Sequence, residues 1–163
     1  MIFVTLGSQK FQFNRLLKEV DTLIEKGKIK EEVFAQIGYS DYKPKNYKYK
    51  TFLDRDEFTD IMSKCDKVIT HGGTGAIIGA VKKNKKVIAV PRLAKFREHV
   101  DNHQLQIIEQ FKEMNFVEGI NNIKELESCL LKIKEKKFNL YVSNTNKIIE
   151  SIEEFIKCKS KKG

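Results

Sequence analysis

Residues 69–76, ITHGGTGA, decide the fold that we expect for this chain. The first residues of the stretch are typical of a buried strand, and the glycines that follow indicate a tight turn into a helix. Such a turn directs several backbone N–H groups and the positive end of a helix toward one point, which suits a phosphate. The stretch therefore predicts a strand, a turn and a helix that together can hold an anion.

A second polar cluster, EHVDNHQ at residues 98–104, follows the strand expected at residues 87–90. Loops after neighbouring parallel strands open on one edge of a sheet, and open α/β sheets bind ligands at that edge. The cluster is dense in groups that donate and accept hydrogen bonds, as sugar hydroxyls require. Together with the turn at Gly7 and Ser8, the two loops are expected to form the walls of one cleft.

Strand and helix patterns alternate along the chain, which predicts an α/β fold with a doubly wound, mostly parallel, Rossmann-like sheet. Strands are expected at residues 2–6, 33–37, 49–53, 67–70, 87–90 and 116–118, and helices at residues 13–24, 75–83, 100–114 and 123–133, with a further helix that begins after Asp54. Residues 1–138 are expected to form this α/β unit. Residues 139–163 are expected to add an amphipathic helix and a basic tail to the same domain.

Composition limits the classes of protein to which the chain can belong. Its 163 residues suffice for one domain, and no apolar run approaches the length that spans a bilayer. Three cysteines without CxxC spacing indicate reduced thiols, two of them packed in the core. The net charge of +9 fits either solvated lysines or an anionic partner such as lipid headgroups, a nucleotide-sugar or nucleic acid. Because no nucleic-acid-binding motif accompanies the lysines, we expect no nucleic-acid partner.

The two histidines of the second cluster raise the question of a metal site. His99 and His103 have i, i+4 spacing on the expected helix, which allows a divalent metal. The segment lacks the HExxH order, and the sequence has no further cysteine or histidine cluster to complete a shell. The sequence therefore predicts no metal, and a solvated helix start without function is an alternative for this segment.

Three motifs in this order resemble a known family: HGGTG at residues 71–75, VPR at 90–92 and EH-x-D-x-H-Q at 98–104. They are similar to the C-terminal, donor-binding domain of family 28 glycosyltransferases, and the opening MIFVTLGS also matches. The likeness covers roughly residues 1 to 120. It implies the C-terminal half of a GT-B enzyme, and the closest subgroup is the stand-alone donor-half subunits of two-component glycosyltransferases. The EHVDNHQ form looks most like that of bacterial capsule and exopolysaccharide galactosyltransferase subunits.

The resemblance also implies roles for individual residues. His71, Gly72, Gly73, Thr74 and Gly75 would hold the diphosphate of a UDP-sugar, with His71 as the catalytic residue that stabilises the departing UDP. The remaining donor-binding residues fall into three groups. These are Glu98, Asp101, His103 and Gln104 for the sugar, Gly7 and Ser8 for the first loop, and Phe52 for the uracil.

Further expectations concern substrates, partners and location. The resemblance implies an inverting transfer without metal or cofactor, with a UDP-sugar as donor and galactose as the favoured sugar. It implies a lipid-linked sugar acceptor and a membrane-anchored acceptor-binding subunit. The chain would then be cytoplasmic, held at the inner face of the membrane through that partner, with a homodimer possible in isolation.

Some residues depart from the family pattern. Gly79 stands where many members have the Glu that holds the ribose, and Val100 and His103 replace the usual Gln and Asn. The glycine supports the alternative of a non-catalytic nucleotide- or sugar-binding regulator.

Overall fold

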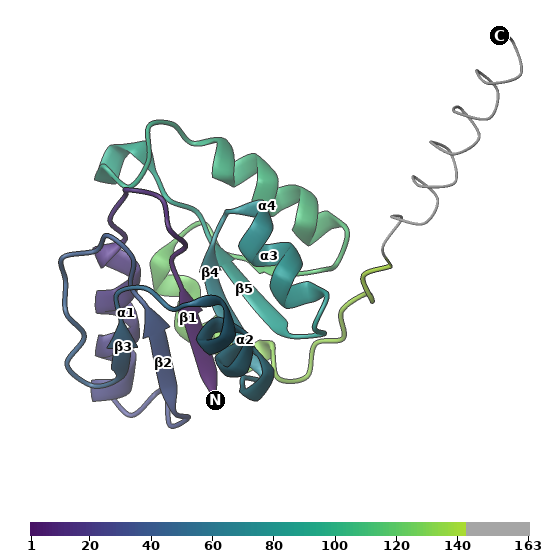
Figure 1. Cartoon of the computed structure of the whole chain (residues 1–163). Helices are drawn as coiled ribbons and strands as arrows, with labels where there is room; N and C mark the ends of the chain where they lie inside the picture. The colour runs from purple at the N-terminus through teal and green to yellow at the C-terminus, as the bar shows by residue number, and fades with distance from the viewer. Residues whose placement is uncertain (143–163) are drawn as a thin grey trace, which may run out of the picture.

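The computed structural model describes residues 1–142, which are built around a six-stranded sheet with the strand order β3-β2-β1-β4-β5-β6 (Figure 1). Every pair of neighbouring strands is parallel. The strands are β1 (Ile2–Thr5), β2 (Val33–Gln36), β3 (Lys48–Lys50), β4 (Lys67–His71), β5 (Lys86–Val90) and β6 (Glu118–Gly119). The strands after β1 are added on one side of it and, from β4 onward, on the other side. Open α/β sheets bind their ligands at this switch point between β1 and β4.

Helices cover both faces of the sheet. Apolar residues of α1 (Asn14–Glu25) and α5 (Leu126–Lys132) pack on one face, together with the short 3-10 turn η2 (Ile123–Glu125). Residues of α2 (Arg55–Lys64), α3 (Thr74–Val81) and α4 (His103–Glu113) pack on the other, as Figure 1 also shows. The predicted doubly wound α/β fold is confirmed.

The alternation of side chains along β1 explains the two cores. Ile2 and Val4 point into the cluster beneath α1, whereas Phe3 points into the opposite cluster, where its ring meets Phe58 edge-on with ring centroids 5.4 Å apart. A side chain of this size stabilises the fold by about 1.5–3 kcal/mol when fully buried. Because both faces are buried, the register of the strands is fixed, and so are the positions of the loops that follow them.

The beginning of α2 follows the sequence closely. Asp54 accepts a hydrogen bond from the backbone N–H of Glu57 at 2.8 Å, and the Glu57 carboxylate accepts one from the backbone N–H of Asp54 at 3.3 Å. This capping box satisfies two N–H groups that a helix start otherwise leaves free, and it confirms that the helix begins after Asp54.

Several predicted boundaries were wrong. The third strand is Lys48–Lys50 rather than 49–53, and the last strand is Glu118–Gly119 rather than 116–118. A Cβ at Gly119 would lie 2.5 Å from Ile108 Cγ2, so the close approach of α4 requires a glycine at this position. The glycine pairs with Ala89 of β5. The helix expected from residue 100 begins only at His103, since residues 99–102 form a turn.

The predicted C-terminal helix, the basic tail and Cys158 lie mainly or wholly beyond residue 142, outside the described residues. Within residues 1–142, no helix is both long and apolar enough to cross a membrane. Cys65 and Cys129 are free and buried, which confirms two packing thiols. Burial raises the pKa of the Cys129 thiol to about 12, so it stays protonated.

Candidate functional site

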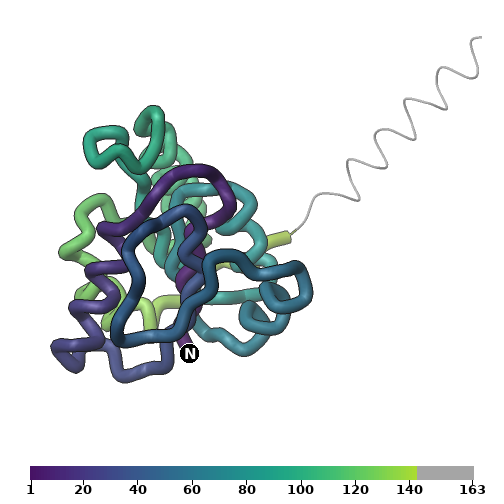
Figure 2. Tube along the Cα trace, turned by 60° about the vertical axis from the view of Figure 1, so that its left-hand side comes forward, coloured from purple at the N-terminus to yellow at the C-terminus, as the bar shows by residue number. Residues whose placement is uncertain are grey.

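Three loops meet at the carboxyl edge of the sheet, as the sequence predicted. They follow β1, β4 and β5, which are neighbours in the sheet. The chain after β1 and the loop after β5 run side by side in both Figure 1 and Figure 2. The two segments are joined by a hydrogen bond from Gln12 Nε2 to the carbonyl oxygen of Phe96 at 2.9 Å. The carboxyl edge therefore brings together the three loops that were predicted to form the walls of a cleft.

His71 is the last residue of β4, and its ring is buried between two glycines. A Cβ at Gly7 would lie 2.7 Å from His71 Cε1, and a Cβ at Gly73 would lie 2.3 Å from Nε2. Gly7 also has a φ of +70°, which L side chains rarely adopt. The two glycines thus make room for the imidazole, a reason that the sequence motif alone does not give.

Burial keeps His71 neutral. Burial is the main cause that lowers the pKa of the imidazole to about 4, and the nearby positive charge of Arg92 is the second. Thr70 Oγ1 donates to the carbonyl oxygen of Thr5 at 2.9 Å and lies 3.4 Å from His71 Nδ1, so its lone pairs favour a proton on Nδ1. An imidazole in this form brings no net charge to the edge of the sheet at neutral pH.

The start of α3 supplies the positive end of a helix. Gly73 is the N-cap residue, no side chain in the described part of the chain caps the helix, and the first backbone bond of the helix runs from Ile77 N to Gly73 O. Thr74 is the first residue of α3 and therefore does not cap it. A Cβ at Gly75 would meet no described atom within 4 Å. The first turn therefore presents backbone N–H groups and open space, as an anion requires.

Gln104 joins two of the loops. Its side chain is buried, and Oε1 accepts hydrogen bonds from the backbone N–H of Gly72 at 3.1 Å and of Arg92 at 3.0 Å. A Cβ at Gly72 would lie 2.6 Å from Gln104 Cβ, which explains the glycine there. Gln104 thus holds the turn after β4 against the loop after β5, and its contact with the sugar stays a prediction.

Glu98 is likewise buried and fully engaged. Its carboxylate accepts from Arg15 Nε at 3.0 Å, from Arg15 Nη2 at 2.9 Å and from the backbone N–H of Leu93 at 3.0 Å. The sequence pointed to Glu98 as a sugar ligand, but in this conformation its oxygens hold the loop onto α1. Sequence reasoning missed Arg15, because no local motif marks a partner that lies 83 residues away.

Arg92 is a second residue to which the motifs assigned no role. Its guanidinium is buried over the ring of Phe13, and Nη2 donates to the carbonyl oxygens of Leu6 at 2.7 Å and Phe11 at 3.3 Å. Burial lowers the pKa of Arg92 to about 10, and among residues 1–142 Nε and Nη1 find no hydrogen-bond partner. Arg92 thus ties the chain after β1 to the end of β5, at a cost in desolvation.

The other predicted residues lie at the surface of this edge. Ser8 is exposed in the turn after β1, and Asp101 and His103 are exposed before and at the start of α4. Phe52 follows β3, is 43% exposed and meets the ring of Tyr39 edge-on with centroids 5.2 Å apart. These residues share one edge, and their contact with a donor stays a prediction.

Comparison with known proteins identifies the class of protein. The family model of the glycosyltransferase family 28 C-terminal domain matches residues 1–158, and this chain belongs to that family. The UDP-N-acetylglucosamine transferase subunit ALG13 of Candida albicans is 33% identical over 84 residues, which make up 52% of this chain and 27% of the relative. The chain thus aligns with about a quarter of that protein.

Two solved structures share the fold. The glycosyltransferase of kitacinnamycin superposes with a TM-score of 0.62 at 15% identity, over 83% of this chain and 35% of the other. The NMR solution structure of ALG13 superposes with a TM-score of 0.56 at 20% identity, over 93% of each chain. The chain therefore has the fold of one half of a GT-B glycosyltransferase.

Proposed function

We propose that this chain is the UDP-sugar-binding catalytic subunit of a heteromeric inverting glycosyltransferase. The proposal rests on the start of α3 at Thr74, which no side chain of the described residues caps. Gly73 precedes this start, and the buried ring of His71 lies against Gly73. Membership of the family supports a diphosphate as the anion that binds there. No cofactor takes part, and the UDP-sugar is the donor substrate.

In the proposed reaction an acceptor hydroxyl attacks the anomeric carbon of the donor sugar from the side opposite UDP. The bond from the anomeric carbon to the phosphate oxygen breaks as the new bond forms, which inverts the configuration. A base on the partner takes the hydroxyl proton, and the negative charge that develops on UDP faces the N-terminus of α3. His71 is neutral near pH 7, so it shapes the phosphate site and does not act as a cation.

A partner is part of the proposal because the described edge of the sheet is open. A donor held on an open face stays hydrated, so the fixed dipoles of the protein act weakly until a second domain covers it. The relative from Candida albicans is named a transferase subunit, which supports a complex of two chains. We assign the acceptor half to a membrane-anchored subunit that presents a lipid-linked sugar, with this chain held at the inner face of the membrane.

Two donor sugars are candidates. The EHVDNHQ loop favours galactose and a role in capsule or exopolysaccharide synthesis, through its likeness to bacterial subunits of that kind. The name of the Candida albicans relative favours N-acetylglucosamine. Both UDP-sugars would place their diphosphate in the same site, so the proposal for UDP does not depend on the choice of sugar.

A paired transferase assay tests the proposal. Purified chain, with and without membranes that carry the acceptor subunit, is offered UDP-galactose, UDP-glucose and UDP-N-acetylglucosamine with a lipid-linked acceptor. We expect transfer from one donor only when both halves are present. UDP binding without transfer under any pairing would instead favour a non-catalytic nucleotide-binding regulator, the alternative that Gly79 supports. Absence of UDP binding would overturn the assignment of the site.

A further inference from the structure

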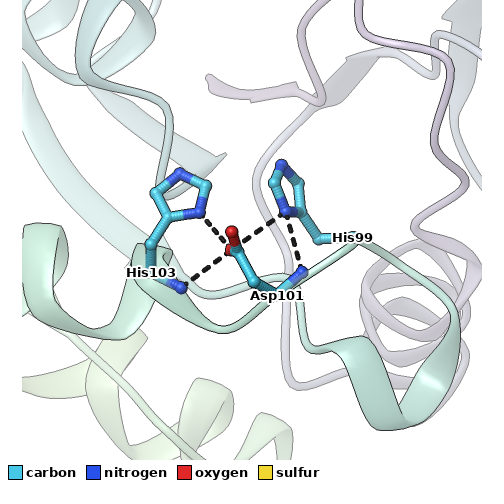
Figure 3. Close-up of side chains that lie close together, drawn as sticks. All are labelled: His99, Asp101 and His103. Atoms are coloured by element: carbon cyan, nitrogen blue, oxygen red, sulfur yellow. Dashed lines mark hydrogen bonds and ion pairs between the residues drawn. The ribbon is translucent and has the colours of Figure 1, made fainter.

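His99, Asp101 and His103 bring two imidazoles and one carboxylate together before and at the start of α4 (Figure 3). One ligand atom from each residue lies within 4.8 Å of the others. Both rings turn their Nδ1 atoms toward the Asp101 carboxylate, as Figure 3 shows. We propose that these three side chains form a binding site for one divalent transition-metal ion of the Zn²⁺ class.

The donor set matches the chemistry of such ions. Imidazole nitrogens and a carboxylate oxygen bind Zn²⁺, Co²⁺ and Ni²⁺, and a zinc site with three protein ligands keeps a fourth position for water or another ligand. Two ligand atoms on a tetrahedral zinc, each about 2.0–2.1 Å from the ion, lie about 3.3 Å apart. His99 Nδ1 and Asp101 Oδ1 are 3.3 Å apart. An ion needs His103 to turn only slightly away from the carboxylate that it now contacts.

The turn before α4 creates this arrangement. On a continuous helix from residue 100, Asp101 would point away from both histidines, because residues two apart do not face each other. The helix begins instead at His103, and Asp101 Oδ1 accepts a hydrogen bond from the backbone N–H of His103 at 3.0 Å. The carboxylate is thereby folded back between the two rings. Asp101 supplies the third ligand that the spacing of the histidines alone lacked.

One ligand of the site is held in place before an ion binds. The side chain of His99 is 8% exposed, and its ring lies against Phe11 with centroids 4.8 Å apart and against His103 at 4.7 Å. His103 and Asp101 are 46% and 56% exposed, so an ion can reach the site from solvent. A partly fixed ligand set lowers the entropy lost on binding.

The site shares Asp101 and His103 with the predicted sugar contacts, but the metal proposal does not rest on the proposed function. Metal binding is measured without UDP-sugar, and UDP binding is measured without metal. Failure of one leaves the other intact, and competition between them is a separate observation.

The test uses the full chain with Cys158→Ser, because Zn²⁺ binds thiols well and the Cys158 thiol could bind the ion in place of the proposed site. Calorimetry with Zn²⁺ and the visible spectrum with Co²⁺ report stoichiometry and ligand geometry. We expect one ion per chain, with affinity at least roughly tenfold weaker in His103→Asn and in Asp101→Asn. Asp60→Asn is the matched control, since Asp60 is also exposed and pairs with Lys64 on α2, and it should bind Zn²⁺ normally.

A second measurement needs no variant. The ring nitrogens of the three histidines are followed by NMR as Zn²⁺ is added, and we expect His99 and His103 to shift while the buried His71 does not. A useful site for this ion should be occupied at about 100 μM Zn²⁺, so absence of binding at that concentration would overturn the proposal. Equal affinity in all variants, or unmoved signals of His99 and His103, would also overturn it and leave a hydrogen-bonded turn only.

Discussion

The imidazole of His71 lies directly against Gly73, so that a Cβ at residue 73 would sit 2.3 Å from its Nε2 atom. The contact couples the end of β4 to the first turn of α3. The position of the helix end, and with it the proposed phosphate site, thus depends on a glycine whose φ of −77° is open to any residue. Steric contact with His71 explains this glycine, and backbone conformation does not.

Gly73→Ala should therefore displace the ring or the helix. We expect a loss of about 1–3 kcal/mol in the free energy of unfolding, as for other overpacked sites, together with loss of UDP binding. Urea unfolding and calorimetry with UDP check both. Gly79→Ala is the control, because a Cβ there meets open space, and it should leave stability unchanged or raised by up to about 1 kcal/mol.

Gly75→Ala separates ligand contact from packing. A Cβ at Gly75 also meets nothing within 4 Å, so the variant should fold as stably as the parent chain. If a phosphate approaches this backbone, the added methyl group should weaken UDP binding about tenfold, or about 1.4 kcal/mol. Unchanged affinity for UDP in a stable Gly75→Ala variant would argue against a phosphate at the start of α3.

The pair of Arg15 and Glu98 should contribute far more than an exposed ion pair of the same length. The Glu98 side chain is 1% exposed and that of Arg15 is 18% exposed, and Arg15 Nη2 lies 2.9 Å from Glu98 Oε2. Removal of one partner from a buried pair costs about 3–5 kcal/mol, and the partial exposure of Arg15 places Glu98→Ala near the lower end. Chemical unfolding measures this cost.

A matched control exists in the pair of Lys28 and Glu127, which are also 2.9 Å apart but 51% and 39% exposed. Glu127→Ala should cost at most about 1 kcal/mol. Equal costs for the two substitutions would show that the loop after β5 does not depend on Glu98.

His71 should make stability depend on pH. Its pKa of about 4 in the folded chain lies below the ordinary value of 6.5, so the unfolded chain binds the proton more tightly. The stabilisation from neutral His71 is complete above about pH 6.5, declines as pH falls and is lost below about pH 4, with a total of roughly 3 kcal/mol. Urea unfolding of the parent chain and His71→Asn between pH 7 and 4 measures the difference.

Carboxylates with lowered pKa values, such as Asp21 and Glu31, reduce stability in the same direction at low pH, but they are present in both proteins. The histidine therefore appears in the difference between the two curves. Parallel curves for His71→Asn and the parent chain would contradict a buried, neutral His71.

Arg92 should act on His71 through its charge. Because burial is the main cause of the low pKa of His71 and Arg92 the second, Arg92→Met should raise the pKa of His71 but leave it below its ordinary value. An NMR titration of the ring nitrogens follows this directly. Arg92→Lys is the control, since it keeps a positive charge near the ring and should leave the pKa of His71 close to that of the parent chain.

The sequence predicted much of this molecule because the responsible interactions are local. The strands β1, β4 and β5 are buried on both faces, and such strands can be recognised in a sequence as short apolar runs. The capping box of Asp54 and Glu57 spans three residues. The HGGTG turn has the geometry of a strand end and a helix start within a few residues, so its place at the carboxyl edge followed from its order in the chain.

The tertiary structure alone decided which side chains at this edge are free and which are engaged. Glu98 and Gln104 belong to the motif, yet partners 83 and 32 residues away in sequence occupy their oxygens. Asp101 reaches the two histidines only because α4 starts at His103 and not earlier. Pairings across such separations depend on how the helices pack against the sheet. Packing follows from the shape of the whole core, and no local pattern of residues contains it.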